Sequence, residues 1–170
     1  MISVMDPKYP TGKFAFDTSP TPQKRSEWIA AIAALPAELK ASIARAGLDT
    51  PYRDGGWTAR QVVHHVADSH MNAFIRFRLA LTEDKPTIKP YNETEWAKLA
   101  DSKLDPSVSL QIIDGLHQRW HTMLLAMSDA DFSREAIHPD HGPRTLDWFL
   151  QLYAWHGRHH VGHVKLTAAA

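Results

Sequence analysis

Four stretches of apolar residues recur at helical spacing along the chain, separated by segments rich in proline and glycine. A repeat of three and four residues between apolar positions is typical of an amphipathic helix. In the first stretch these positions are Trp28, Ile29, Ile32, Leu35, Leu39 and Ile43. No segment has a convincing strand pattern. Four helices of about 20 residues each predict an all-α four-helix bundle.

Local signals predict the helix boundaries. The first helix is expected to begin after Ser19 or Thr21 and to stop at Gly47. Pro36 lies inside it and is expected to kink the helix or divide it in two. The second helix should begin sharply, because Thr58 and Gln61 have the spacing of a capping box.

The same signals predict the bounds of the other helices and of the segments between them. The second helix is expected to run to about residue 81, the third from about 105 to 127, and the fourth from about 145 to 166. Residues 83–102 are too long for a tight turn, so they predict a crossover or lid between the second and third helices. Residues 1–20 contain several prolines and predict an extended arm on a single domain that spans residues 1–170.

Composition excludes several classes of function. The 19 basic and 19 acidic residues balance, so neither a nucleic-acid-binding protein nor a polybasic membrane binder is expected. The chain has no cysteine, which excludes disulfides and thiolate metal sites. We read no signal peptide in the first residues and no apolar run long enough to span a bilayer. A cytoplasmic protein is expected.

The chain contains 11 histidines, and most of them are clustered. Residues four apart lie on one face of a helix, so three pairs could hold an ion, namely His156 with His160, His159 with His163, and His117 with His121. The apolar stripe of the fourth helix continues into His156 and His160 and places His159 to one side.

A third ligand has to come from another helix. Catalytic zinc takes three protein ligands and keeps one position open. The second helix offers His64 or His65. Its polar residues His65, Asp68, Asn72 and Arg76 recur at steps of three and four, a stripe that either faces solvent or lines a site. Gly157 follows His156 where a zinc protease would need glutamate.

Six segments resemble the YfiT group of the DinB superfamily, and together they span nearly the whole chain. They are YPTGKF at 9–14, LDTPYR at 48–53, WTARQVVHHVADSHMN at 57–72, IKPY at 88–91, LHQRW at 116–120 and YAWHGRHH at 153–160.

The resemblance implies a DinB-like helical bundle, usually a homodimer, that binds one zinc or nickel ion per chain. It places the ligands on His65, His156 and His160. It also implies a metal-dependent hydrolase acting on a small molecule. Related proteins imply an alternative, a transferase that activates a low-molecular-weight thiol such as bacillithiol on the metal.

The other roles are less constrained. Asn72 and Arg76 are candidates for binding a carboxylate or phosphate of the substrate. Asp68 and His159 are candidates for a general base by position only, so the catalytic residues stay unassigned. A third hypothesis is a non-catalytic metal-stabilised binding protein, in which Glu93 or Glu95 fills the fourth metal position.

Overall fold

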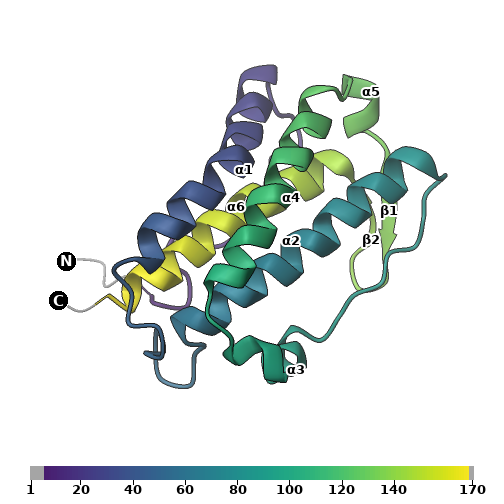
Figure 1. Ribbon diagram of the computed structural model, residues 1–170. Helices are drawn as coiled ribbons and strands as arrows, with labels where there is room; N and C mark the ends of the chain where they lie inside the picture. Colours follow the sequence, from purple (N-terminus) through teal and green to yellow (C-terminus); the bar gives the residue numbers. More distant parts are fainter. Residues whose placement is uncertain (1–5, 169–170) are drawn as a thin grey trace.

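The computed structural model describes residues 6–168, and its four long helices form a bundle (Figure 1). The long helices are α1 (Pro22–Ile43), α2 (Ala59–Thr82), α4 (Ser107–Leu125) and α6 (Leu146–Leu166). Between them lie the short elements α3 (Glu93–Trp96), η1 (Ala100–Lys103), α5 (Asp129–Phe132), β1 (Glu135–His138) and β2 (Gly142–Thr145). The predicted four-helix bundle is therefore confirmed.

Side-chain caps explain where the long helices begin. Thr21, Thr58 and Thr145 each accept a hydrogen bond from a backbone N–H in the first turn of α1, α2 and α6. At α2 the reciprocal bond from Gln61 is also present, which confirms the predicted capping box. At its other end α1 stops at Ile43, so the prediction that it extends to Gly47 is wrong.

The linker between α2 and α4 allows these two helices to run in the same direction. It runs back along the bundle, so that α2 and α4 start at the same end of the molecule (Figure 1). α1 packs against α4 and α6, and α2 also packs against both of these helices. Large apolar side chains from all four helices fill the interior, among them Ile32, Leu35, Phe77, Ile113, Trp120, Phe149 and Leu150.

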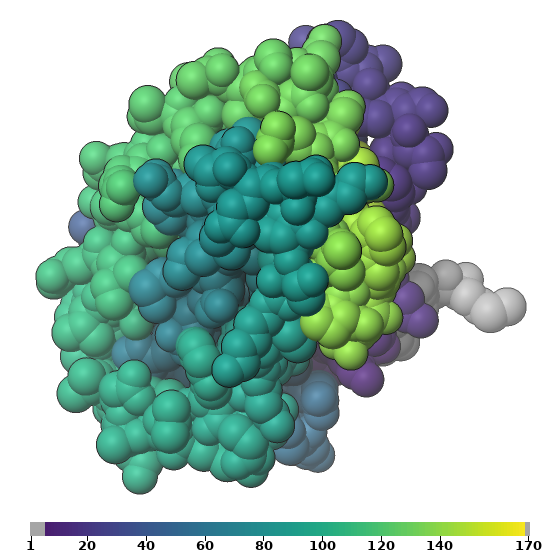
Figure 2. All heavy atoms as spheres, turned by 90° about the vertical axis from the view of Figure 1, so that its right-hand side faces the viewer, coloured from purple at the N-terminus to yellow at the C-terminus, as the bar shows by residue number. Residues whose placement is uncertain are grey.

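The expectation that the chain has no strand is wrong. β1 and β2 pair antiparallel with Glu135 opposite Thr145, and Gly142 adopts a positive φ of 71° at the turn. β1 also bonds to the linker, through Ile88 N–H to the Ile137 carbonyl (3.0 Å) and Ile137 N–H to the Pro86 carbonyl (2.9 Å). The hairpin and the linker together cover one side of the bundle (Figure 2).

The N-terminal segment contains no helix between residues 6 and 20. Gln151 of α6 holds it, accepting from the Asp17 N–H (2.9 Å) and donating to the Asp17 carbonyl (3.0 Å). Trp155 donates to the Gly12 carbonyl (3.0 Å). Residues 1–5 of the predicted arm lie outside the described residues. Between residues 6 and 168, no helix combines the length and the apolar composition that a membrane span requires.

Candidate metal centre

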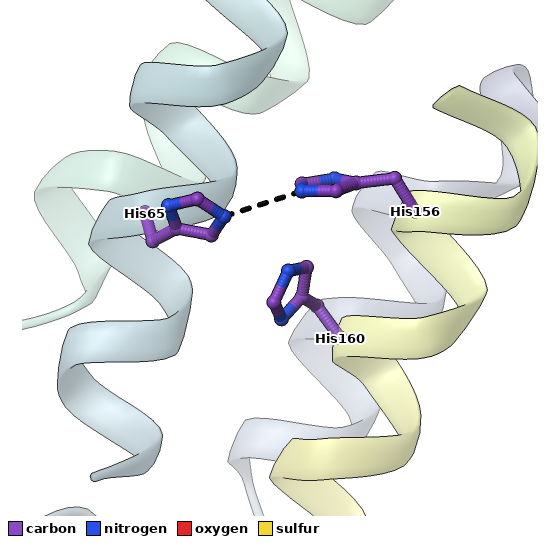
Figure 3. A group of neighbouring side chains, drawn as sticks. All are labelled: His65, His156 and His160. Carbon is purple, nitrogen blue, oxygen red and sulfur yellow. Dashed lines mark hydrogen bonds between the residues drawn. The ribbon is translucent and has the colours of Figure 1, made fainter. Parts of the chain in front are cut away.

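Helices α2 and α6 bring three histidines together. His65 lies two turns after the capped start of α2, while His156 and His160 lie one turn apart on α6 (Figure 3). Gly157 allows α6 to approach α1 closely, because a Cβ at this position would lie 2.9 Å from Leu35 Cδ2. The position of the α6 histidines thus depends on a glycine that lies between them.

The three rings point toward one another in Figure 3. Each ring offers one nitrogen, and these atoms all lie within 4.8 Å of one another. The shortest separation is 3.2 Å, between His65 Nε2 and His156 Nε2. Among the histidines, cysteines and acidic residues between residues 6 and 168, no other group of three or more comes close enough to hold an ion. Neither His117 with His121 nor His159 with His163 forms such a group.

Burial keeps the three imidazoles uncharged at neutral pH. Together with the neighbouring His163 and His159, it lowers the pKa of His65 to about 4. Burial also lowers the pKa of His156 and His160 well below the usual value, with the other histidines of the group adding to the effect. An uncharged imidazole has a free lone pair, and this is the form that binds a metal. The residues therefore fit a divalent metal ion.

A cavity of about 440 Å³ opens beside the three histidines. Its walls are largely aromatic. Trp57 packs on the His65 ring (centroids 4.7 Å apart), Tyr52 stacks on His163 (3.8 Å), and Trp155 stacks on His159 (4.5 Å). Lys8, Arg53 and Glu93 also border it. All three histidines of the triad line this cavity.

Glu93 brings a carboxylate to the triad. Its Oε2 atom lies 3.9 Å from His65 Nε2, and its side chain is 60% exposed on the rim of the cavity. Partial burial raises the pKa of this carboxyl group. Glu93 lies in α3, within the linker, which explains how a residue 28 positions after His65 returns to the same site.

His159 also faces the site. The sequence pattern placed it to one side of the inward face, yet it is buried and borders the same cavity as the triad. Its Nδ1 atom is buried and has no hydrogen-bond partner among residues 6–168. A buried nitrogen without a hydrogen-bond partner is rare in folded proteins.

The other predicted polar residues lie away from the cavity. Arg76 is buried and donates to the Tyr153 hydroxyl (2.7 Å) and to the Lys89 carbonyl (3.2 Å). Asn72 donates to the Asp68 carbonyl one turn earlier (2.8 Å). Asp68 is half-buried, and burial raises its pKa from 3.8 to about 6, with nearby Asp101 adding to the rise. None of these three borders the cavity beside the triad.

Three more buried histidines, His64, His70 and His163, lie near the triad, and the sequence offered His64 and His163 as candidate ligands. His64, beside the triad, bonds instead to Ser109 Oγ (2.7 Å) and the Leu104 carbonyl (3.1 Å). His70 Nε2 lies 3.1 Å from His156 Nδ1, and His163 Nδ1 lies 3.3 Å from His160 Nδ1. Spacing along one helix could not reveal the contact between His70 and His156, because these residues are on different helices.

Fold and geometry together define a helical-bundle protein with a three-histidine cluster at the edge of a cavity. The model of the DinB superfamily matches residues 38–164. The chain belongs to this superfamily, which confirms the family inferred from the sequence segments.

Individual relatives agree with this assignment. A protein of Bacillus mycoides is 51% identical over 162 residues, covering 94% of each chain, and is named "putative metal-dependent hydrolase". A protein of Bacillus cereus has the same identity, coverage and description. The solved structure of YfiT from Bacillus subtilis is 47% identical, covers 93% of each chain and superimposes with a TM-score of 0.89. YfiT is described as a probable metal-dependent hydrolase with an unusual four-helix bundle topology.

Proposed function

We propose that this protein is a metal-dependent hydrolase in which His65, His156 and His160 bind one zinc or nickel ion. The observation that carries the proposal is the convergence of three uncharged ring nitrogens, within 4.8 Å of one another, at the edge of a cavity. Three protein ligands leave a coordination position for water or substrate, as catalytic zinc sites do. The names of the relatives support the same reaction class.

The ion would act as a Lewis acid that acidifies water and polarises the bond to be cleaved. The residues of this chain supply the remaining chemistry. Glu93 is the carboxylate best placed to accept a proton from the attacking water, since it lies 3.9 Å from His65 and borders the cavity. His159 borders the same cavity and would contact the substrate. Trp57, Tyr52 and Trp155 would enclose its apolar part.

The cavity is of a size suited to a small-molecule substrate rather than a macromolecule. Binding of substrate by Asn72 and Arg76 stays a prediction, and the hydrogen bonds of Arg76 to Tyr153 and Lys89 also give it a role in holding the linker on α2. Arg53 and Lys8, which do border the cavity, are better placed to attract an anionic group.

A hydrolysis screen tests the proposal directly. Untagged protein, stripped with a chelator and reloaded with zinc or nickel, is assayed against ester, amide and lactone panels. We expect turnover that depends on the metal. Glu93→Gln should lower kcat by about 100-fold or more while metal content stays the same. Glu95→Gln is the matched control, since Glu95 pairs with Lys98 on the surface and should leave kcat unchanged.

The same protein separates the alternatives. Turnover only when a low-molecular-weight thiol and an electrophile are both present would replace hydrolysis with the thiol-transferase reaction. If Glu93→Gln instead loses the ion, Glu93 is a ligand that closes the fourth position, and the non-catalytic binding protein is favoured. Unchanged kcat in Glu93→Gln would remove Glu93 from the mechanism.

Assembly and compartment are further parts of the proposal. A homodimer is supported by exposed apolar side chains one turn apart on α4, Val108 (42% exposed) and Ile112 (43%). The cytoplasm is supported by the lack of cysteine. Light scattering of the purified protein measures the first, and cell fractionation measures the second.

A further inference from the structure

A buried hydrogen-bonded chain connects all four long helices to the candidate metal centre. It begins at the Ile32 carbonyl of α1, which lies 2.6 Å from Nδ1 of His117 on α4. Nε2 of His117 lies 3.0 Å from Nδ1 of His70 on α2, and Nε2 of His70 lies 3.1 Å from Nδ1 of His156 on α6. His70 and His117 are 0% and 1% exposed, so water does not compete for these bonds.

Pro36 explains why the Ile32 carbonyl is available. In an α-helix the carbonyl of residue 32 would accept from the N–H of residue 36. Proline has no N–H, yet α1 continues unbroken through Pro36. The Ile32 carbonyl therefore lacks its helical partner, and His117 takes that place. The proline that is anomalous in the sequence creates a buried acceptor.

A carbonyl can only accept, and this fixes the direction of every bond in the chain. His117 and His70 are fully buried and bond only to ring nitrogens and a backbone carbonyl, so each ring is uncharged and carries one N–H. His117 must carry its proton on Nδ1 to donate to Ile32. Its bare Nε2 then accepts from His70 Nδ1–H, and the bare Nε2 of His70 accepts from His156 Nδ1–H.

The last step leaves His156 Nε2 with a free lone pair. This atom is the one that lies 3.2 Å from His65 Nε2 at the centre of the triad. The opposite tautomer of His156 would point an N–H at the ion and could not bind it.

We propose that His70 and His117 are positioning residues, which use the carbonyl freed by Pro36 to fix the tautomer and orientation of His156 for metal binding. The inference rests on the proposed metal centre. Metal-bound histidines commonly donate their second N–H to a carboxylate, carbonyl or water, and loss of that partner weakens metal binding. Here the N–H of His156 is donated to His70, and the direction of that bond is set, through His117, by the Ile32 carbonyl in α1.

The proposed positioning role concerns His156 alone, since the second ligand on α6 has a different histidine partner. His160 Nδ1 faces His163 Nδ1 at 3.3 Å, and either ring can donate in such a pair.

Histidine ¹⁵N NMR of the metal-free protein tests the proton positions without any ion. The shifts of Nδ1 and Nε2 distinguish the two tautomers of each ring. We expect His117, His70 and His156 all to carry the proton on Nδ1. Finding His156 protonated on Nε2 would overturn the inference, and this result is independent of whether the protein binds metal.

The second test measures the zinc dissociation constant by competition with a chromophoric chelator. His117→Phe keeps a ring between His70 and Trp120 but removes both nitrogens. We expect the Kd to rise by about 10- to 100-fold. His64→Phe is the matched control, because His64 is also a buried histidine with two partners but takes no part in the hydrogen bonds between Ile32 and His156. Its Kd should not change.

The outcomes separate the two proposals. An unchanged Kd in His117→Phe, or an equal rise in both variants, would overturn the positioning role while the metal centre stands. A wild-type protein that takes up no zinc would overturn the metal centre, and the NMR result would still decide the proton order. Circular dichroism checks that each variant is folded, and the wild-type NMR measurement decides the matter if His117→Phe does not fold.

Discussion

Gly157 and Gly115 both lie inside long helices, and replacing each with alanine is expected to change stability in opposite directions. Alanine is favoured over glycine in a helix interior by about 1 kcal/mol. Gly115 of α4 is exposed, and a Cβ built there meets nothing within 4 Å. Gly115→Ala should therefore raise the free energy of unfolding by about 1 kcal/mol.

At Gly157 the same gain is opposed by a steric conflict. A Cβ there would lie 2.9, 3.1 and 3.4 Å from Cδ2, Cδ1 and Cγ of Leu35. Carbon atoms normally approach to about 3.5–4.0 Å, and Leu35 is only 2% exposed, so it cannot swing into solvent. Inserting a methyl group into a packed core costs about 1–3 kcal/mol. The net change for Gly157→Ala is a loss of about 0–2 kcal/mol.

The difference in the free energy of unfolding between the two variants is the more precise test. Gly157→Ala should be less stable than Gly115→Ala by about 1–3 kcal/mol in urea unfolding of the metal-free proteins. Chelator is included because a bound ion would stabilise each variant by an amount that depends on its affinity. If both variants are stabilised equally, the close approach of α1 and α6 does not limit position 157, and the explanation for glycine beside His156 is wrong.

Three further predictions concern the elements that hold the site. Thr58→Ala removes the cap of α2 and should lower the free energy of unfolding by about 1 kcal/mol, measured by urea unfolding, and an unchanged midpoint would show that the capping box contributes nothing. Burial raises the pKa of Asp68 from 3.8 to about 6, so the unfolded chain releases the Asp68 proton at lower pH than the folded protein does. The free energy of unfolding of the wild type, relative to that of Asp68→Asn, should therefore fall as pH rises from about 4 to 6 and level off above it. A difference that does not change with pH would contradict the burial argument. Gln151→Leu removes both hydrogen bonds to the Asp17 backbone and should speed proteolysis and amide exchange in residues 12–20, without moving exchange in α2.

The bundle could be predicted from the sequence because its signals are local. The period of the apolar residues identifies each long helix, and the capping pattern at Thr58 identifies the start of α2 to the residue. The hairpin could not be predicted in the same way. Its strands are four residues each and contain Pro143, and β1 is held partly by bonds to the linker some 50 positions earlier. Such pairing leaves no periodic trace.

The candidate site could likewise be predicted only in part. His156 with His160 could be selected from the apolar stripe of α6, whereas the choice of His65 over His64 required the family resemblance. The structure gives the physical reason for that choice, since His64 is occupied by Ser109 and the Leu104 carbonyl. The support of His156 by His70 could not be predicted, because it depends on how two helices pack. Pro36 was visible as an anomaly, but its consequence depends on His117 facing α1.

Metal uptake by His65→Ala tests the central claim most directly. Untagged wild-type protein, His65→Ala and His64→Ala are each stripped, reloaded with zinc and measured by elemental analysis, with circular dichroism to confirm that each is folded. Removing one of three ligands should abolish tight binding while the bundle survives, because its core lies in other residues. We predict about one ion per chain for the wild type and His64→Ala, and none for a folded His65→Ala. Full stoichiometric zinc in His65→Ala would contradict the assignment of His65, His156 and His160 as the metal site.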